Sequence, residues 1–102
     1  MYYRLDDDHL VVPATRDEMY ALFDDGFEDS RRVAKTTVGS VDVSTVFLVL
    51  DHNWGDGPPL VFETMVFGGE GEPQWRYATW DEAIAGHERV VAALRAGTEL
   101  PE

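Results

Sequence analysis

Cysteine is absent from this chain of 102 residues. Disulfides, thiolate metal sites and cysteine nucleophiles are therefore excluded. Long apolar runs are missing too, since none approaches the roughly 18 residues that cross a bilayer. Residues 1–8 carry the wrong charge for a secretory signal. We expect a protein of the reducing cytosol, with no membrane segment and no bound cofactor.

The chain also contains few positively charged residues. The sequence holds 8 Lys and Arg against 20 Asp and Glu, for a net charge of −12, and Lys35 is its one lysine. Phosphate backbones are bound by clustered cations, so we expect no direct binding to nucleic acid or to anionic membranes. Two interpretations of the acidity stay open. One is a carboxylate surface that imitates a phosphate backbone in the basic cleft of another protein; the other is solubility or adaptation to high salt.

What the sequence does contain is enough apolar material for one packed core. Hydrophobic residues make up 44% of the chain and aromatic residues 12%, and the length fits one domain over residues 1–102. Capping boxes at residues 15–18 and 79–82 predict the starts of two helices, and Gly97 ends the second. Residues 2–5 and 9–12 are short apolar pieces that indicate a small hairpin.

The middle of the chain is typical of β structure. Strands are expected at residues 32–38, 41–50 and 60–67, with a short fourth strand at 75–78. Gly39 and Ser40 form a turn signal that pairs Val38 with Val41. Residues 46–50 are apolar on both faces, which predicts a central strand covered on both sides. The order of elements predicts an α+β fold: an antiparallel three- to four-stranded meander, with a helix before it and a C-terminal helix packed on it.

A candidate polar site consists of Asp51, His52, Glu63 and His87. Glu63 interrupts an apolar strand, His87 lies in the apolar stripe of the last helix, and the other two follow the central strand. Together they could bind a divalent metal or run acid–base chemistry. Alternatively, Glu63 and His87 satisfy each other inside the core. An unpaired buried carboxylate costs several kcal/mol, so we expect Glu63 within hydrogen-bond reach of His87, His52 or Tyr77.

Carboxylates gather in the first third of the chain, whereas six of the eight cations lie beyond residue 30. A one-sided negative face is what a nucleic-acid mimic needs. Trp54 lies in a polar loop, where it either anchors a protein contact or packs back over the sheet. The expected partner-binding residues are Asp6, Asp7, Asp8, Asp24, Asp25, Glu28, Asp29 and Trp54.

Four segments carry a family resemblance: RRVAKTTV at 31–38, VSTVFLVLDH at 43–52, PLVFETMVFGG at 59–69 and RYATW at 76–80, followed by Gly86 and His87. In order and spacing they resemble a family of small proteins encoded by bacteriophages and prophages, usually left without an assigned function. The resemblance implies a viral accessory protein made in the cytoplasm of the host cell. It implies no reaction.

Three classes of function follow. The leading hypothesis is a non-enzymatic phage accessory protein that binds a host or viral protein, with inhibition by nucleic-acid mimicry as one mode. The second is a small metal-dependent or acid–base enzyme using Glu63, His87 and His52. The third is a structural or assembly component of a phage. A central strand that is apolar on both faces also predicts an exposed apolar patch or a homodimer.

Overall fold

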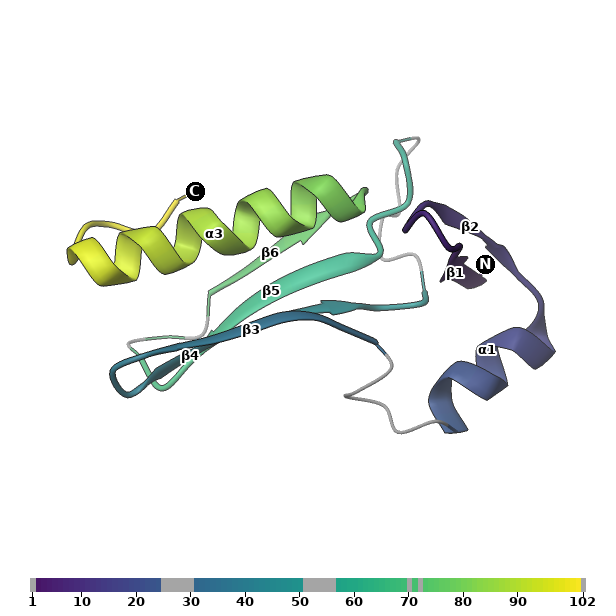
Figure 1. Ribbon diagram of the computed structural model, residues 1–102, viewed down its shortest axis with the longest axis horizontal. Helices are drawn as coiled ribbons and strands as arrows, with labels where there is room; N and C mark the ends of the chain where they lie inside the picture. Colours follow the sequence, from purple (N-terminus) through teal and green to yellow (C-terminus); the bar gives the residue numbers. More distant parts are fainter. Residues whose placement is uncertain (1, 25–30, 51–56, 70, 72, 102) are drawn as a thin grey trace.

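The computed structural model describes residues 2–24, 31–50, 57–69, 71 and 73–101. Its elements follow the chain in the order β1 (Tyr2–Leu5), β2 (Val11–Ala14), α1 (Arg16–Asp24), β3 (Arg32–Val38), β4 (Val41–Phe47), β5 (Phe62–Phe67), β6 (Gln74–Tyr77) and α3 (Trp80–Ala96). Strands β3 to β6 form one antiparallel sheet, and β1 and β2 form a separate hairpin (Figure 1). The α+β fold is confirmed.

Strand β4 lies between β3 and β5, as the apolar pattern predicts. The turn at Gly39 and Ser40 pairs Val38 with Val41, and Gly39 has a φ of 62°. Glycine reaches this left-handed region without steric penalty, which explains its place in the turn. The antiparallel meander and its first turn are therefore confirmed.

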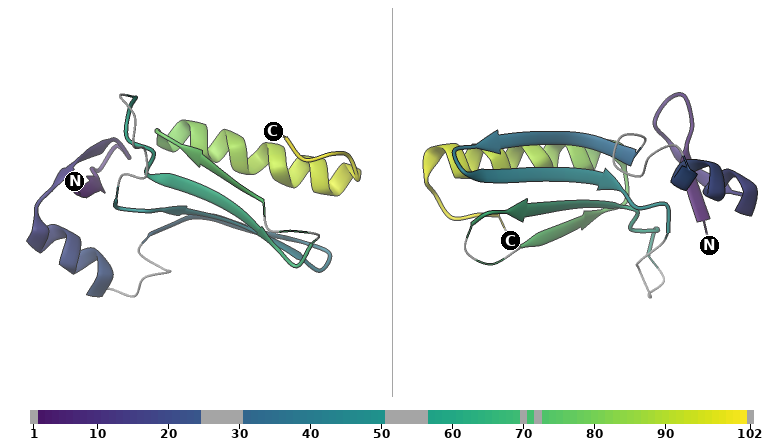
Figure 2. Two further views of the ribbon diagram at one scale, coloured as in Figure 1. Left: turned by 180° about the vertical axis from the view of Figure 1, so that it is seen from behind. Right: turned by 90° about the horizontal axis from the view of Figure 1, so that it is seen from below.

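Helix α3 covers one face of the sheet (Figures 1 and 2). The side chains beneath it come from alternate positions of β4 and β5: Val43, Thr45, Phe47, Phe62, Thr64 and Val66, all buried. In the second view of Figure 2 the strands lie in front of α3, and no described helix covers their other face. The expectation that the central strand is covered on both sides is therefore wrong for β4 (Val41–Phe47).

The apolar run at residues 46–50 has a different explanation. Strand β4 ends at Phe47, and the chain bends at Val49, whose φ is 72°. The Val49 carbonyl then accepts a hydrogen bond of 2.8 Å from the Tyr3 N–H, and Leu50 forms a bridge with Tyr2. The end of the run therefore attaches the hairpin to the sheet.

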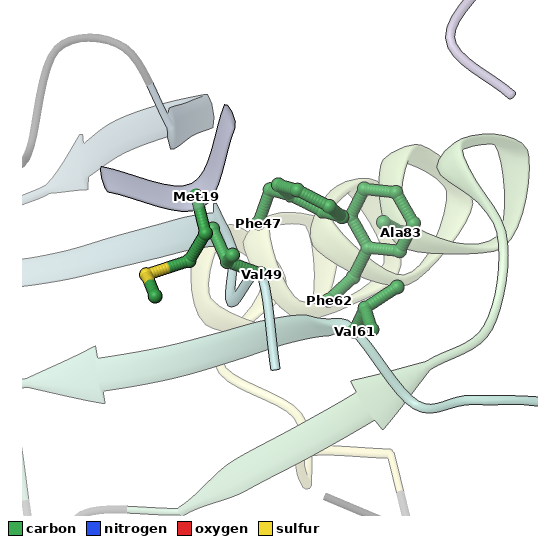
Figure 3. Close-up of a cluster of buried hydrophobic side chains, with 6 residues drawn as sticks. All are labelled: Met19, Phe47, Val49, Val61, Phe62 and Ala83. Atoms are coloured by element: carbon green, nitrogen blue, oxygen red, sulfur yellow. The ribbon is translucent and has the colours of Figure 1, made fainter. Parts of the chain in front are cut away.

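The core joins all these parts. One cluster consists of Met19, Phe47, Val49, Val61, Phe62 and Ala83 (Figure 3). It takes side chains from α1, the sheet and α3, with the hairpin packed against it. Burial at about 25 cal/mol per Å² of apolar surface makes such a cluster the main source of stability. It also fixes the hairpin near the start of α3.

Both helix starts confirm the predicted capping boxes. The Thr79 hydroxyl accepts a hydrogen bond of 3.1 Å from the Glu82 N–H. The Thr15 hydroxyl accepts one of 3.2 Å from Glu18, whose carboxylate accepts the Thr15 N–H at 3.0 Å. At its other end α3 stops at Gly97, in the left-handed conformation. No described helix has the length and apolar character needed to cross a membrane.

Candidate functional site

Glu63 and His87 lie on opposite sides of the sheet, so the predicted pair does not form. Side chains alternate along a strand, and Phe62 and Thr64 are the ones that point toward α3. Glu63 projects from the other face, where its Oε2 accepts a hydrogen bond of 3.1 Å from Arg76 Nε. Arg76 stands opposite it on β6. The carboxylate, 9% exposed, is thus satisfied by a neighbouring strand.

His87 belongs to a buried chain of hydrogen bonds. Its Nδ1 lies 2.7 Å from the Thr45 hydroxyl and its Nε2 lies 2.9 Å from that of Thr36. The Thr45 hydroxyl in turn bonds to Thr64. Burial lowers the pKa of His87, and the negative charge of Glu88 partly opposes the shift. A neutral imidazole donates once and accepts once, which hydroxyl partners can match, so this cluster ties α3 to three strands.

Several predicted site residues lie outside the described residues: Asp25, Glu28, Asp29, Asp51, His52 and Trp54. Asp24 is the last residue of α1. Within the described ranges, no group of three or more His, Asp and Glu residues could hold a metal ion. Neither Glu63 nor His87 therefore belongs to a metal cluster of the described chain.

The predicted acidic cluster at residues 6–8 has two roles. The Asp6 carboxylate accepts hydrogen bonds of 2.9 Å from the N–H groups of Asp8 and Leu10, which shapes the turn between β1 and β2. Asp7 and Asp8 are exposed. The Asp6 carboxylate therefore stabilises the hairpin turn, whereas those of Asp7 and Asp8 face solvent.

A large hollow lies between this hairpin and the start of α3. We call it the hairpin–helix groove. Its volume is about 690 Å³, within the range of pockets that bury small molecules. Figure 1 shows the hairpin beside the N-terminal end of α3. The groove is lined by Tyr3, Asp8, His9, Leu10, Val11, Val12, Pro58, Pro59, Ala78, Thr79, Trp80, Asp81 and Glu82.

Trp80 is the aromatic centre of the groove. Phe62 meets its ring edge-on in the core, with centroids 6.4 Å apart. His9 stacks on it, with centroids 3.9 Å apart and ring planes within 8°. His9 has a φ of 63°, and its N–H donates a 3.0 Å hydrogen bond to the Asp6 carbonyl. The hairpin turn thus presents an exposed ring to a fixed indole.

The described charged residues of the groove are acidic. Asp8 comes from the hairpin, Asp81 and Glu82 come from the first turn of α3, and none of the described residues that line the groove is a lysine or arginine. A helix N-terminus alone favours anions. Here Thr79 already caps it, and two carboxylates oppose its positive end. The groove therefore favours a cationic ligand with apolar parts.

A smaller hollow of about 270 Å³ lies on the open face of the sheet. Arg32, Lys35, Asp42, Ser44, Val46, Met65 and Phe67 line it. Phe67 is 42% exposed, but charged side chains border the apolar ones. A homodimer through this face stays a prediction.

Sequence reasoning missed the groove. It used Trp80 only as part of the segment at residues 76–80, gave His9 no role of its own, and treated Glu82 as part of a capping box. The lining comes from residues 3–12, 58–59 and 78–82, which only the tertiary fold brings together. The one local signal was a tryptophan directly followed by two carboxylates at a helix start.

Comparison with protein-family models, curated proteins and solved structures finds no match to this chain.

Proposed function

We propose that this protein acts without catalysis, by binding a basic segment of a partner protein in the hairpin–helix groove. The observation that carries the proposal is the composition of the lining. Aromatic and aliphatic side chains surround the hollow, and its charged residues, Asp8, Asp81 and Glu82, are exposed carboxylates. Apolar contacts supply affinity in such a groove, while complementary charge selects the partner.

The charge of the whole chain supports the same partner chemistry. A net charge of −12 attracts basic surfaces over a long range and repels nucleic acid and anionic lipid. Electrostatic steering raises the rate at which a basic partner meets the groove, by up to about 10³-fold at low salt. Binding should weaken as the salt concentration rises.

The sequence resemblance suggests a setting for this activity. In that setting the protein is a phage accessory protein in the host cytoplasm, and its partner is a host or viral protein. Inhibition by nucleic-acid mimicry is one form that the interaction can take, because a partner segment rich in Lys and Arg is also what binds phosphate backbones. Competition between this protein and double-stranded DNA for the captured partner distinguishes that form.

The other two classes of function have less support. An enzyme based on Glu63, His87 and His52 requires its first two residues to meet, and their side chains leave the sheet on opposite faces. His87 also has both ring nitrogens engaged by threonine hydroxyls. A structural role in a phage particle has no observation that favours it over binding.

The test uses the full chain and a fluorescent peptide of alternating arginine and leucine, with a glutamate–leucine peptide as the acidic control. In one variant, Asp8→Asn, Asp81→Asn and Glu82→Gln remove the groove charges. Glutamine at position 82 retains the capping-box pattern. Fluorescence anisotropy should show at least a tenfold loss of affinity for the basic peptide in this variant.

A matched variant carries the same loss of charge elsewhere: Asp17→Asn, Glu88→Gln and Glu99→Gln, all exposed and outside the groove. It should lose less than threefold. Equal losses in the two variants would mean that the peptide senses only net charge, and the groove would then not be the binding site.

A further inference from the structure

This inference rests on the proposed function and names the group that the groove recognises. We infer that the groove is specific for arginine: a guanidinium from the partner stacks on the indole of Trp80, at the place that the His9 ring occupies in the free protein.

The indole is a fixed platform. Trp80 is the first residue of α3, directly after the cap at Thr79, so its backbone is set by the helix start. Phe62, fully buried, packs against the indole from the core side. A ring held in this way loses little conformational freedom when a ligand stacks on it.

The His9 ring covers one face of the Trp80 indole and is easily displaced from it. The ring is parallel to the indole within 8°, so this face of Trp80 accepts a planar group. Within the described part of the chain, no hydrogen bond or ion pair holds the imidazole, and His9 is exposed. Moving the ring aside sacrifices one stacking contact.

Arginine fits the vacated place better than lysine does. A guanidinium is planar, stacks on aromatic faces and is weakly hydrated, whereas an ammonium is a compact and strongly hydrated charge. Asp8 directly precedes His9 and Asp81 directly follows Trp80, and both line the groove. Carboxylates bind guanidinium through paired hydrogen bonds.

The apolar residues of the groove determine which ligand residues fit beside that arginine. Leu10, which is 61% exposed, lines the groove with Val11, Val12 and Pro59. These side chains offer apolar surface to an aliphatic residue beside the arginine. The expected ligand is therefore a segment of a partner protein in which arginine alternates with leucine, isoleucine or valine.

Three peptides test the inference on the intact protein: arginine–leucine, lysine–leucine and citrulline–leucine. Citrulline keeps the planar shape of arginine without its charge. The arginine peptide should bind at least fivefold more tightly than either of the others. In the nuclear magnetic resonance spectrum, it should shift the Trp80 indole N–H and the His9 ring signals more than the lysine peptide does.

Three variants, at two positions, locate the preference. Trp80→Leu should reduce the arginine-to-lysine affinity ratio to below two, and Trp80→Phe should retain part of it. His9→Ala should leave the ratio intact and raise arginine affinity up to about threefold. Since the wild-type resonance shifts need no substitution, they decide the question even if a Trp80 variant unfolds.

The outcomes separate this inference from the proposed function. Equal affinities for arginine and lysine peptides, both lost when the groove carboxylates are neutralised, would overturn arginine specificity and leave the proposed function standing. Binding of neither basic peptide would overturn the proposed function itself.

Discussion

Two polar regions of this protein differ in how their groups are satisfied. Beneath α3, His87 is 5% exposed and meets a hydroxyl at each ring nitrogen. In the hairpin–helix groove, Asp8 and Asp81 are exposed and form no ion pair with any described residue. Burial with neutral partners stabilises the fold, whereas exposed charge without a partner remains available for binding. Residue type alone does not separate these roles.

The largest expected effect comes from His87→Ala. It leaves a cavity and removes a partner from the buried Thr45 hydroxyl, so the free energy of unfolding should fall by about 2–4 kcal/mol. Urea denaturation measures the loss. Peptide binding at the groove should change less than twofold at a temperature where the variant is folded. A stable variant that no longer binds would place His87 in the binding site and remove the contrast.

Asp6 and Asp7 offer a comparison inside one turn. Asp6→Ala removes an acceptor from two N–H groups, so it should lower the free energy of unfolding by about 1–2 kcal/mol. Asp7→Ala should change it by less than about 0.5 kcal/mol, as for ordinary surface positions. Urea denaturation of both variants checks the difference. Equal losses would show that the turn depends on general charge.

Glu63→Gln tests the buried carboxylate on the other face of the sheet. Glutamine keeps the shape but removes the charge that pairs with Arg76, so a loss of about 1 kcal/mol in unfolding free energy is expected. A double-mutant cycle with Arg76→Gln should assign most of that loss to the pair. Groove binding should be unaffected. A Glu63→Gln variant of full stability that has lost binding would instead indicate a functional carboxylate.

The smallest effect is the pH dependence contributed by His87. Its pKa in the folded protein lies below the ordinary value because burial disfavours the charged ring. The unfolded chain therefore binds the proton first. The neutral ring contributes fully above about pH 6.5, and stability falls as the pH drops through that value toward the folded pKa. The difference in urea midpoint between wild type and His87→Gln, followed from pH 8 to 5, should shrink accordingly.

Glu18 also has a lowered pKa in the folded protein. Hydrogen bonding from the Thr15 N–H is the main cause of the lowered pKa of Glu18. Its contribution is present above about pH 4.3 and is lost as the pH falls through its folded pKa. A pH-independent difference between wild type and His87→Gln would show that the ring is not kept neutral by burial.

The sequence predicts the elements because their signals are local. Threonine and glutamate three residues apart mark both helix starts, and Gly39 marks the turn that sets the register of β3 against β4. Alternation in β5 also contained the information that Glu63 and Phe62 face opposite ways. What it did not contain was the side on which α3 packs, because β5 is apolar at most positions on either side of Glu63.

The remaining errors come from contacts between distant segments. The composition of residues 46–50 predicts one continuous strand. It contains no signal for the bend at Val49, where the chain turns to hydrogen-bond with β1. Arg76 was not expected as the partner of Glu63, because that pairing depends on the register of β6 against β5. The groove combines three segments, so no window of sequence could contain it.

The bend at Val49 has a consequence for how this position tolerates change. A β-branched residue at a φ of 72° is strained by about 1–3 kcal/mol, yet this side chain is fully buried in the cluster that joins hairpin and sheet. Glycine would relieve the backbone but empty the core, whereas isoleucine or leucine would fill the core and keep the strain. Position 49 thus combines a backbone conformation that favours glycine with a core environment, beside Met19, Phe47 and Val61, that favours an aliphatic side chain.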